Sequence, residues 1–215
     1  MPPTELLNLT HIVSEAAQSI DQFINEHGDC LSFNPQAPDL PPLSPETAAF
    51  HRARITLCGA ASNLIDLTLT ARESVVFRCF NVHTASALRI AYRFKLAHAV
   101  PLDGSVIYDV IAQRVRLPAT AVERVIAVLI SSHFFHLAPN GISHTQLSHL
   151  LASNERFEAF LGLCFEEVFI GSTHLANALQ IWGASIEPNE TGWNIANVTQ
   201  NMFYQHLESD TSSSE

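Results

Sequence analysis

The sequence lacks glycines that lie close together. Its 215 residues include eight glycines, and no two of them fall within eight residues of each other: they stand at 28, 59, 104, 141, 162, 171, 183 and 192. A nucleotide-like cofactor is normally held by the backbone amides of a Gly-x-Gly turn between a strand and a helix. Neither such a turn nor an alternation of strands with helices is visible. We therefore predict no cofactor and no cofactor-binding residue in this chain.

Cysteines and basic residues are also scarce. Cys30, Cys58, Cys79 and Cys164 lie 28, 21 and 85 residues apart, which is no metal-ligand or CxxC spacing. We expect four buried thiols in a reducing compartment and no metal. The 11 Lys and Arg against 21 Asp and Glu give a net charge of −10. Phosphate affinity comes largely from Lys and Arg, so this balance opposes binding to nucleic acid or to an anionic membrane.

No targeting segment is evident at the beginning of the sequence. Residues 1–30 contain neither Lys nor Arg nor a continuous apolar core, unlike a signal or transit peptide. The uncharged run Val125–Asn154 is long enough to cross a bilayer, but Pro139-Asn140-Gly141 and four histidines interrupt it. We expect a soluble protein of the cytoplasm or nucleus, with neither a nucleic acid nor a membrane as its partner.

Apolar residues, in contrast, are abundant. They make up 47% of the chain and charged residues only 15%, which favours a helical protein with more apolar surface than its own core needs. Self-association is the ordinary use of such an excess. Residues 1–50 carry seven acids and no Lys or Arg, whereas residues 51–100 carry seven bases against two acids. These oppositely charged segments could pair within the fold or across a dimer.

Apolar spacing predicts helices through the first hundred residues. We expect an amphipathic helix in residues 1–33, and an extended connector in 34–45, where five of twelve residues are proline. Residues 46–100 then form a helical dimerisation region. It holds one helix from a Ser44 cap to about Leu69, and two short helices that break near Asn81–Thr84. The side chains expected to be buried are Ile55, Leu57, Leu64, Ile65, Leu69, Val75, Val76, Phe77, Phe80, Val82, Leu88, Ile90, Tyr92 and Phe94.

Residues 101–153 show the clearest architecture. A turn at 101–104 precedes a short helix over Val106–Val115, with Ile107, Val110 and Ile111 inward, and a second helix follows Pro118. The sequence FFHLA-PNG-ISHT then predicts a hairpin, because Asn-Gly readily takes positive φ angles. Helix, turn, helix and hairpin predict a winged helix. The expected fold class is therefore mainly α: a helical dimerisation domain that contains a winged helix with one small β-hairpin.

This winged helix is not expected to read DNA. A recognition helix carries Arg, Lys, Asn or Gln on its outer face, whereas the second helix offers only Glu123 and Arg124, which cancel. We expect it to serve as a packing module for dimerisation. One long helix should follow over residues 155–182.

Isolated polar residues indicate no catalytic or metal site. His133 and His136, and likewise His144 and His149, do not have the i, i+4 spacing of helical metal ligands. Adjacent Glu166 and Glu167 point about 100° apart on a helix, so at most one faces any pocket. We therefore predict no catalytic and no metal-binding residue.

The order of several motifs resembles fungal O-methyltransferases that act on polyketide and related secondary-metabolite phenols. The motifs are PLDGSVIYDVIAQRVRLPATAVERVI (101–126), AYRFKLAHAVPLDGS (91–105), ISHTQLSHLLA (142–152), FEEV (165–168) and EPNETGWNIA (187–196), with Met202-Phe203-Tyr204 after them. The resemblance covers residues 5 to 208 and the first half of the family's pattern. In that family a Rossmann-like domain that binds S-adenosylmethionine follows.

The resemblance implies a plant-type dimerisation domain truncated before the methyl-donor site. Residues 154–208 would then be a long helix and the joint to a missing catalytic domain, and residues 209–215 a disordered tail. Related domains lend an aromatic side chain to cap the partner's substrate pocket. The corresponding lid or interface candidates are Phe134, Phe165, Phe169 and Trp182.

The leading hypothesis is a chain that acts by association in a secondary-metabolite pathway. Its partner would be a second copy, a full-length methyltransferase-like protein, or a transcription factor, as in a related fungal lineage of methyltransferase-like coactivators. Methyl transfer by this chain alone is not expected. The alternatives are a non-methylating enzyme of the pericyclase or isomerase type, and a fragment of a full-length O-methyltransferase.

Overall fold

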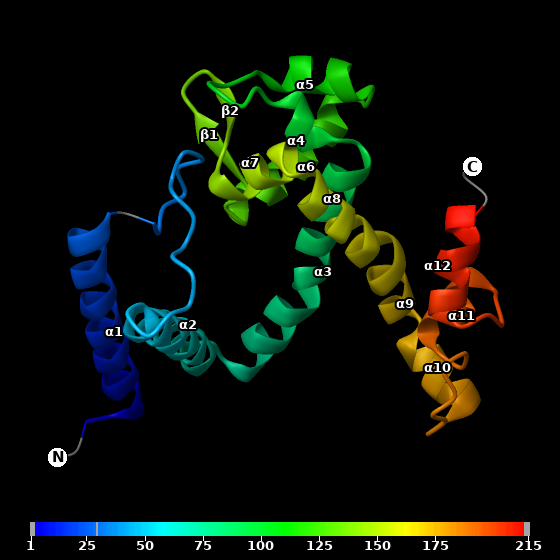
Figure 1. Cartoon of the computed structure of the whole chain (residues 1–215), viewed down its shortest axis with the longest axis horizontal. Helices are drawn as coiled ribbons and strands as arrows, with labels where there is room; N and C mark the ends of the chain where they lie inside the picture. Colours follow the sequence, from blue (N-terminus) through cyan, green and yellow to red (C-terminus); the bar gives the residue numbers. More distant parts are fainter. Residues whose placement is uncertain (1–2, 29, 213–215) are drawn as a thin grey trace. The chain divides into compact units, whose positions relative to one another are not determined.

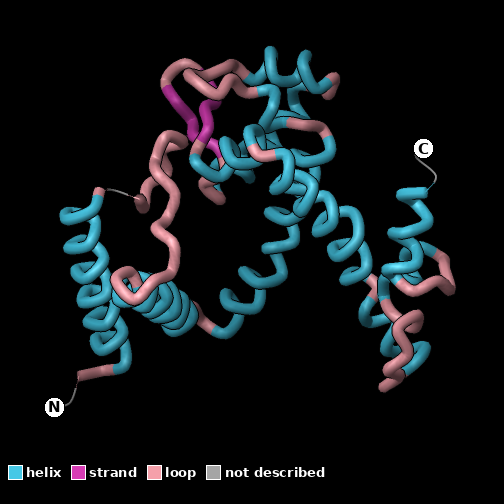
Figure 2. The backbone as a smooth tube through the Cα atoms, viewed as in Figure 1, coloured by secondary structure: helices cyan, strands magenta, loops and turns pink. Residues whose placement is uncertain are grey.

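The computed structural model describes residues 3–28 and 30–212, which fold into mainly helical structure with one small sheet (Figures 1 and 2). The chain divides into two compact units between Leu150 and Leu151. The elements of the first unit are α1 (Glu5–His27), α2 (Ala48–Thr68), α3 (Ala71–Arg93), α4 (Leu96–Ala99), α5 (Tyr108–Val115), α6 (Ala119–Ser131), β1 (Phe135–Ala138), β2 (Gly141–His144) and the start of α7 (Gln146–Ser153). Those of the second unit are α8 (Glu155–Gly162), the π-helix η1 (Leu163–Val168), α9 (Phe169–Thr173), α10 (Leu175–Trp182), α11 (Gly192–Asn197) and α12 (Phe203–Ser212).

Helices α1 and α2 pack along each other and share a small core. Ile20 and Phe50 are buried there, and the ring of Phe23 stacks on that of Phe50 with centroids 4.3 Å apart. Cys30 closes this core from the following segment. The predicted amphipathic helix therefore buries one face: Ala16 and Ile20 are buried, and Leu9 and Val13 are partly buried.

Two predictions about α2 are wrong. The helix begins at Ala48, because Ser44 and Thr47 bond to each other in a turn that precedes it. Ile55 and Ile65, expected inside, are 73% and 51% exposed. Helix α2 has apolar residues on more than one face, and the periodicity alone does not say which face meets α1.

Helix α3 is continuous from Ala71 to Arg93, although a break near Asn81–Thr84 was expected. The segment contains no Pro or Gly to interrupt it, and a capping box of Thr70 and Glu73 fixes its first turn. Its second half packs against α6 through the buried side chains of Ala87 and Ala91. It runs from the α1–α2 pair to the helices around the sheet (Figure 1).

The main core of the first unit lies around α6. Val122, Ile126 and Leu129 are fully buried at the helical spacing that the sequence shows, and α6 contacts α3, α5 and β1. The predicted short helix begins at Tyr108 rather than Val106. Ile107, expected inward, is half exposed.

The hairpin forms as predicted, but its turn differs. β1 and β2 are antiparallel, with Phe135 opposite His144 and Ala138 opposite Gly141. Of the Asn140-Gly141 pair, only Gly141 has a positive φ, of 134°. Val106 forms a two-way backbone bridge to Ile142, with N–O distances of 2.9 and 2.8 Å. A Cβ on Gly141 would lie 2.4 Å from the Val106 carbonyl oxygen, so the close approach requires glycine.

The second unit does not contain the single long helix predicted over 155–182. The helix changes to the π-helix η1, ends near His174, and resumes as α10 up to Gly183. In the described part of the chain no single helix is long and apolar enough to span a bilayer. The pair Glu155–Thr173 and Leu175–Trp182, bent by 48°, reaches that length and composition only together.

The C-terminal residues also differ from the predicted disordered tail at 209–215. Helix α12 continues to Ser212, and residues 213–215 lie outside the described residues.

Candidate functional site

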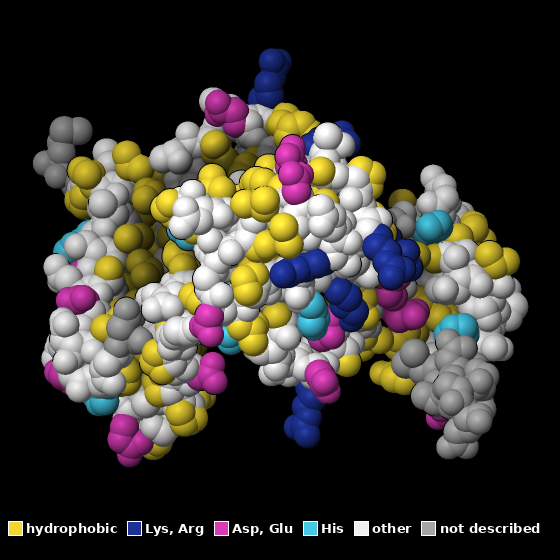
Figure 3. Space-filling view, turned by 90° about the horizontal axis from the view of Figure 1, so that it is seen from above, with side chains coloured by type: hydrophobic (Ala, Val, Ile, Leu, Met, Phe, Trp, Pro, Cys, Tyr) yellow, Lys and Arg dark blue, Asp and Glu magenta, His cyan; other side chains and the backbone are white. Residues whose placement is uncertain are grey.

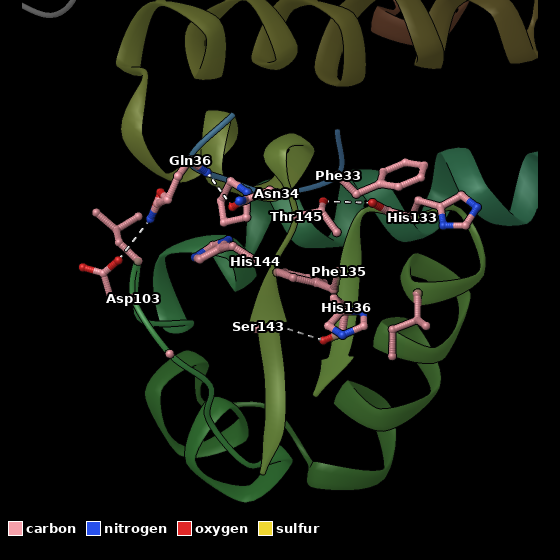
Figure 4. Close-up of a pocket in the computed structure, with 14 residues that line it drawn as sticks. Phe33, Asn34, Gln36, Asp103, His133, Phe135, His136, Ser143, His144 and Thr145 are labelled. Atoms are coloured by element: carbon pink, nitrogen blue, oxygen red, sulfur yellow. Dashed lines mark hydrogen bonds between the residues drawn. The ribbon is translucent and has the colours of Figure 1, made fainter. Parts of the chain in front are cut away.

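A groove of about 640 Å³ lies between the connector and the hairpin in the first unit (Figure 4). Residues 33–36, in the segment between α1 and α2 that we now call the connector, form one side. Residues 102–104, which precede α5, line another part of the groove. The end of α6 and the hairpin form the rest. Figure 4 shows His144 and Phe135 in its middle, between a polar end and an aromatic end. We call this feature the hairpin groove.

His144 joins three segments beneath the hairpin groove. Its side chain is 5% exposed. Its Nε2 lies 3.2 Å from the carbonyl oxygen of Val100, and its Nδ1 lies 2.8 Å from the Oγ of Ser148. A carbonyl can only accept, so Nε2 carries a proton. In the neutral imidazole Nδ1 then accepts from the Ser148 hydroxyl, whereas in the charged form Nδ1 would donate to the Ser148 oxygen.

The surroundings of His144 favour that neutral form. Burial lowers the pKa of His144, the hydrogen bond to Val100 raises it in part, and the nearby His149 and His98 lower it. Next to it, Thr145 Oγ1 donates to the carbonyl oxygens of His133 and Phe134, at 2.9 and 2.8 Å. The His-Thr pair is therefore a packing element that fixes the base of the hairpin.

His133 adopts an unusual backbone conformation at the rim of the hairpin groove. Its φ is 57°, a left-handed value that glycine normally takes. The amide of His133 donates to Ile130 O at 3.0 Å, and that of Phe134 donates to Leu129 O at 2.8 Å. These two bonds end α6 in a Schellman motif. The His133 ring stacks on Phe33, with centroids 4.6 Å apart.

A second polar cluster lies in the second unit, where two of the sequence motifs meet. The Nε1 of Trp193 donates to Glu167 Oε2 at 2.5 Å, so FEEV and EPNETGWNIA are in contact. A Cβ on Gly192 would lie 2.4 Å from the carbonyl oxygen of Gly171. Glycine thus allows α11 to approach the end of α9 closely. The ring of Phe203 packs edge-on against Trp193.

Asn194 holds the residues that follow this cluster. Its side chain is buried and donates to the carbonyl oxygens of Thr199 and Asn201, at 3.1 and 2.9 Å. It also accepts from the hydroxyl of Thr191 at 2.7 Å. The motif EPNETGWNIA is therefore a cap and a buried anchor for the C-terminal segment of the second unit.

The third notable feature is an apolar surface on the first half of α3. Five large side chains there, 44–62% exposed, form what we call the α3 apolar segment: Val75, Val76, Phe77, Phe80 and Val82. At about 100° per residue, they cover more than half of the helix circumference. They were expected to be buried. Cys79 beside them and Cys58 on α2 are exposed, contrary to the predicted buried thiols, whereas Cys30 is buried.

The four predicted lid or interface residues do not share one element. Phe134 is buried in the first unit, with its ring edge-on to Phe135. In the second unit, Phe165 lies in η1 and Phe169 opens α9, and both are partly buried. Trp182, also partly buried, ends α10. Their role as a lid stays a prediction.

Sequence reasoning missed the residues that link distant segments. No local pattern predicts a partner for Glu167, which accepts from Trp193, 26 residues away. The connector residues of the hairpin groove carry no recognisable motif. Ser148, four residues after His144, had a local signal, because a hydroxyl at that spacing can reach back to the imidazole.

Several curated fungal proteins are similar in sequence to this chain. No family model matches it. The O-methyltransferase aurJ of Gibberella zeae is 25% identical over 209 residues, which are 95% of this chain and 47% of that protein. The O-methyltransferase CTB2 of Cercospora beticola is 26% identical over 89% of this chain and 42% of its own length. The O-methyltransferase AMT9 of Alternaria alternata is 30% identical over 73% and 37%. The chain thus spans less than half the length of each of these relatives.

Solved structures with the same fold include complexes of OxaC and a pericyclic enzyme. OxaC in complex with sinefungin and meleagrin superposes with a TM-score of 0.70 at 16% identity, over 95% of this chain and 47% of OxaC. A structure described as a pericyclic reaction enzyme gives 0.67 at 12% identity, over 94% and 47%. By sequence, therefore, the chain is a homologue of fungal O-methyltransferases, and it has the fold of these structures over about half of their length.

Proposed function

We propose that this chain acts by association, as the helical dimerisation part of an O-methyltransferase-like protein in a fungal secondary-metabolite pathway. The α3 apolar segment is the observation that carries this proposal. Monomeric proteins rarely expose so many large apolar side chains on one element. Figure 3 shows hydrophobic side chains spread over the face of the molecule that it displays.

The geometry of the α3 apolar segment favours an enclosing helical partner. A helix that is apolar around most of its circumference is normally buried on more than one side. Burying one large apolar side chain contributes about 1.5–3 kcal/mol, so five such side chains suit a stable interface. A second chain with the same helices fits this surface.

The distribution of charge supports a partner of the same kind. Residues 1–50 carry seven acids and no Lys or Arg, and residues 51–100 carry seven bases and two acids. The acidic helix α1 of one chain can therefore meet the basic region of a second. Such complementarity selects the partner and speeds encounter.

The region from α5 to β2 fits the proposal as a winged helix used for packing. It presents two helices, a hairpin and a bridge from Val106 to the hairpin. The exposed polar residues of α6 include Glu123 and Arg124, whose charges cancel. A DNA reader needs cations on this surface, so the module serves protein association.

The partner is a second copy or a full-length methyltransferase-like protein. In a regulatory form of this proposal, the same complex binds a transcription factor and acts as a coactivator. In both forms the relatives' reaction is not carried out by the residues described above.

Sedimentation equilibrium at about 20 µM protein tests the association. We expect a dimer, or a complex with an added full-length methyltransferase-like protein. The double variant Phe77→Ser/Phe80→Ser should be monomeric and keep its helical circular dichroism, because both side chains are more than half exposed. Ile186→Ser, at a 94% exposed position, is the matched control and should still associate. A wild-type monomer that forms no complex with either partner would contradict the proposal.

A second candidate is non-methylating catalysis, which the hairpin groove favours. Its volume of about 640 Å³ suits a small-molecule ligand, and the pericyclic enzyme has the same fold. Incubation of the purified chain with pathway intermediates would show a rate enhancement that is lost on denaturation. An unchanged rate would remove this candidate.

A further inference from the structure

The hairpin groove is held open by hydrogen bonds that fix its connector side. The amide of Gln146 donates to the carbonyl oxygen of Phe33 at 3.1 Å. Asn34 Oδ1 accepts from the amide of Gln36 at 3.0 Å, and Gln36 Nε2 donates to Asp103 Oδ1 at 3.1 Å. The connector is therefore tied both to the start of α7 and to the 102–104 turn. A ligand would meet a preformed site with a low ordering cost.

One end of the hairpin groove is aromatic. The rings of Phe33 and His133 stack at an interplanar angle of 25°. The Phe33 side chain is 61% exposed, although it is large and apolar. Aromatic faces favour stacked planar rings. This end therefore selects a flat ring over a branched aliphatic group.

The other end of the hairpin groove is polar and carries one negative charge. Asp103 lies beside Gln36 and Asn34 there, and Figure 4 shows the three together, away from Phe33 and His133. Of the carboxylate oxygens of Asp103, one accepts from Gln36. None of the groove-lining residues that the structure describes is Lys or Arg. An anionic ligand would therefore meet a repulsive charge without compensation, whereas an ammonium group would meet an acceptor.

We propose that the hairpin groove binds a planar aromatic molecule that carries a protonated amine. The ring lies against Phe33 and His133, and the ammonium group donates to Asp103 and Gln36. This site is separate from the α3 apolar segment and does not rest on the proposed association.

The test uses three probes with one ring system: 2-naphthylmethylamine, 2-naphthylmethanol and 2-naphthoate, titrated by calorimetry into the full chain. We expect the amine to bind about tenfold more tightly than the alcohol, and the carboxylate to bind most weakly. Asp103→Asn should remove the difference between the amine and the alcohol. Phe33→Ala should weaken the amine and the alcohol alike.

The net charge of −10 attracts any amine weakly, so a charge-matched control is needed. Asp109→Asn removes the same charge at an exposed position on α5 that does not line the groove, and it should leave the preference intact. The proposal is overturned by equal affinity for amine and carboxylate, by an equal effect of Asp103→Asn and Asp109→Asn, or by no saturable binding at millimolar amine. Sedimentation of the same samples shows whether association is intact, so failure of this site is distinguishable from failure of the proposed function.

Discussion

The two halves of α3 differ in how far their apolar side chains are buried. In the second half, Ala87 and Ala91 are buried, and these small residues let the helix lie close to α6. In the first half, Val75, Phe77 and Phe80 are large and more than half exposed. The same helix thus completes one core inside the chain and leaves a second apolar surface exposed. The second half also holds the large side chains of Leu88 and Ile90, which are partly buried, so packing against α6, rather than side-chain size, separates the two halves.

The largest expected effect comes from deleting a side chain in the completed core. Ile126→Ala on α6, where the side chain is fully buried, should lower the free energy of unfolding by about 2–5 kcal/mol, because it removes apolar contacts and leaves a cavity. Phe80→Ala removes a larger side chain from the exposed half. It should change the unfolding free energy of the monomer little and weaken association instead.

Urea denaturation at one fixed, low protein concentration measures the first quantity, since association would itself add stability. Sedimentation measures the second. A loss of monomer stability with Phe80→Ala as large as that with Ile126→Ala would mean that the first half of α3 is already packed within its own chain.

A smaller effect is expected at the hairpin. Gly141→Ala places a Cβ 2.4 Å from the Val106 carbonyl oxygen at a φ of 134°, so the bridge from Val106 to Ile142 must break. We expect a loss of about 2–3 kcal/mol in unfolding free energy. Gly104→Ala is the control: its φ is 92°, but nothing lies near its Cβ. It should cost less, and equal losses from the two variants would show that the close approach contributes nothing.

The pH dependence of stability should report on His144. Its pKa is lowered by burial in the folded state, so the folded chain binds this proton less readily than the unfolded chain. The contribution of His144 to the free energy of unfolding is fully present above its unfolded-state pKa of about 6.5. It is lost as pH falls through the lower pKa of the folded state. The melting temperature should therefore fall below about pH 6.5, and His144→Gln should make this fall smaller. His11→Gln, at an exposed position on α1, controls for the loss of an imidazole elsewhere in the chain.

Local patterns in the sequence predict the core around α6 and the hairpin well. The buried spacing of Val122, Ile126 and Leu129 and the pairing of β1 with β2 both follow from short-range periodicity and turn chemistry. Periodicity fails on α3, because it marks apolar residues without saying which of them are buried within the chain. The same limit explains the wrong inward assignment of Ile55 and Ile65.

Contacts between distant segments could not be predicted from single motifs. Gln36 and Asp103 are 67 residues apart, and Glu167 and Trp193 are 26 apart. In neither pair does the local sequence predict which residue is the partner. The hairpin groove and the anchor of the second unit therefore emerge only from the tertiary structure.

The smallest expected effect separates backbone strain from ring stacking at His133. His133 and Arg116 both end a helix with left-handed φ angles, 57° and 56°, and the His133 ring also stacks on Phe33. Replacing either by glycine relieves the steric cost of a Cβ in this conformation. His133→Gly also removes the stack, which contributes about 0.5–1 kcal/mol. We therefore expect Arg116→Gly to stabilise the chain more than His133→Gly does by that amount in urea denaturation. Equal gains would mean that the Phe33–His133 contact holds neither the connector nor the aromatic end of the hairpin groove in place.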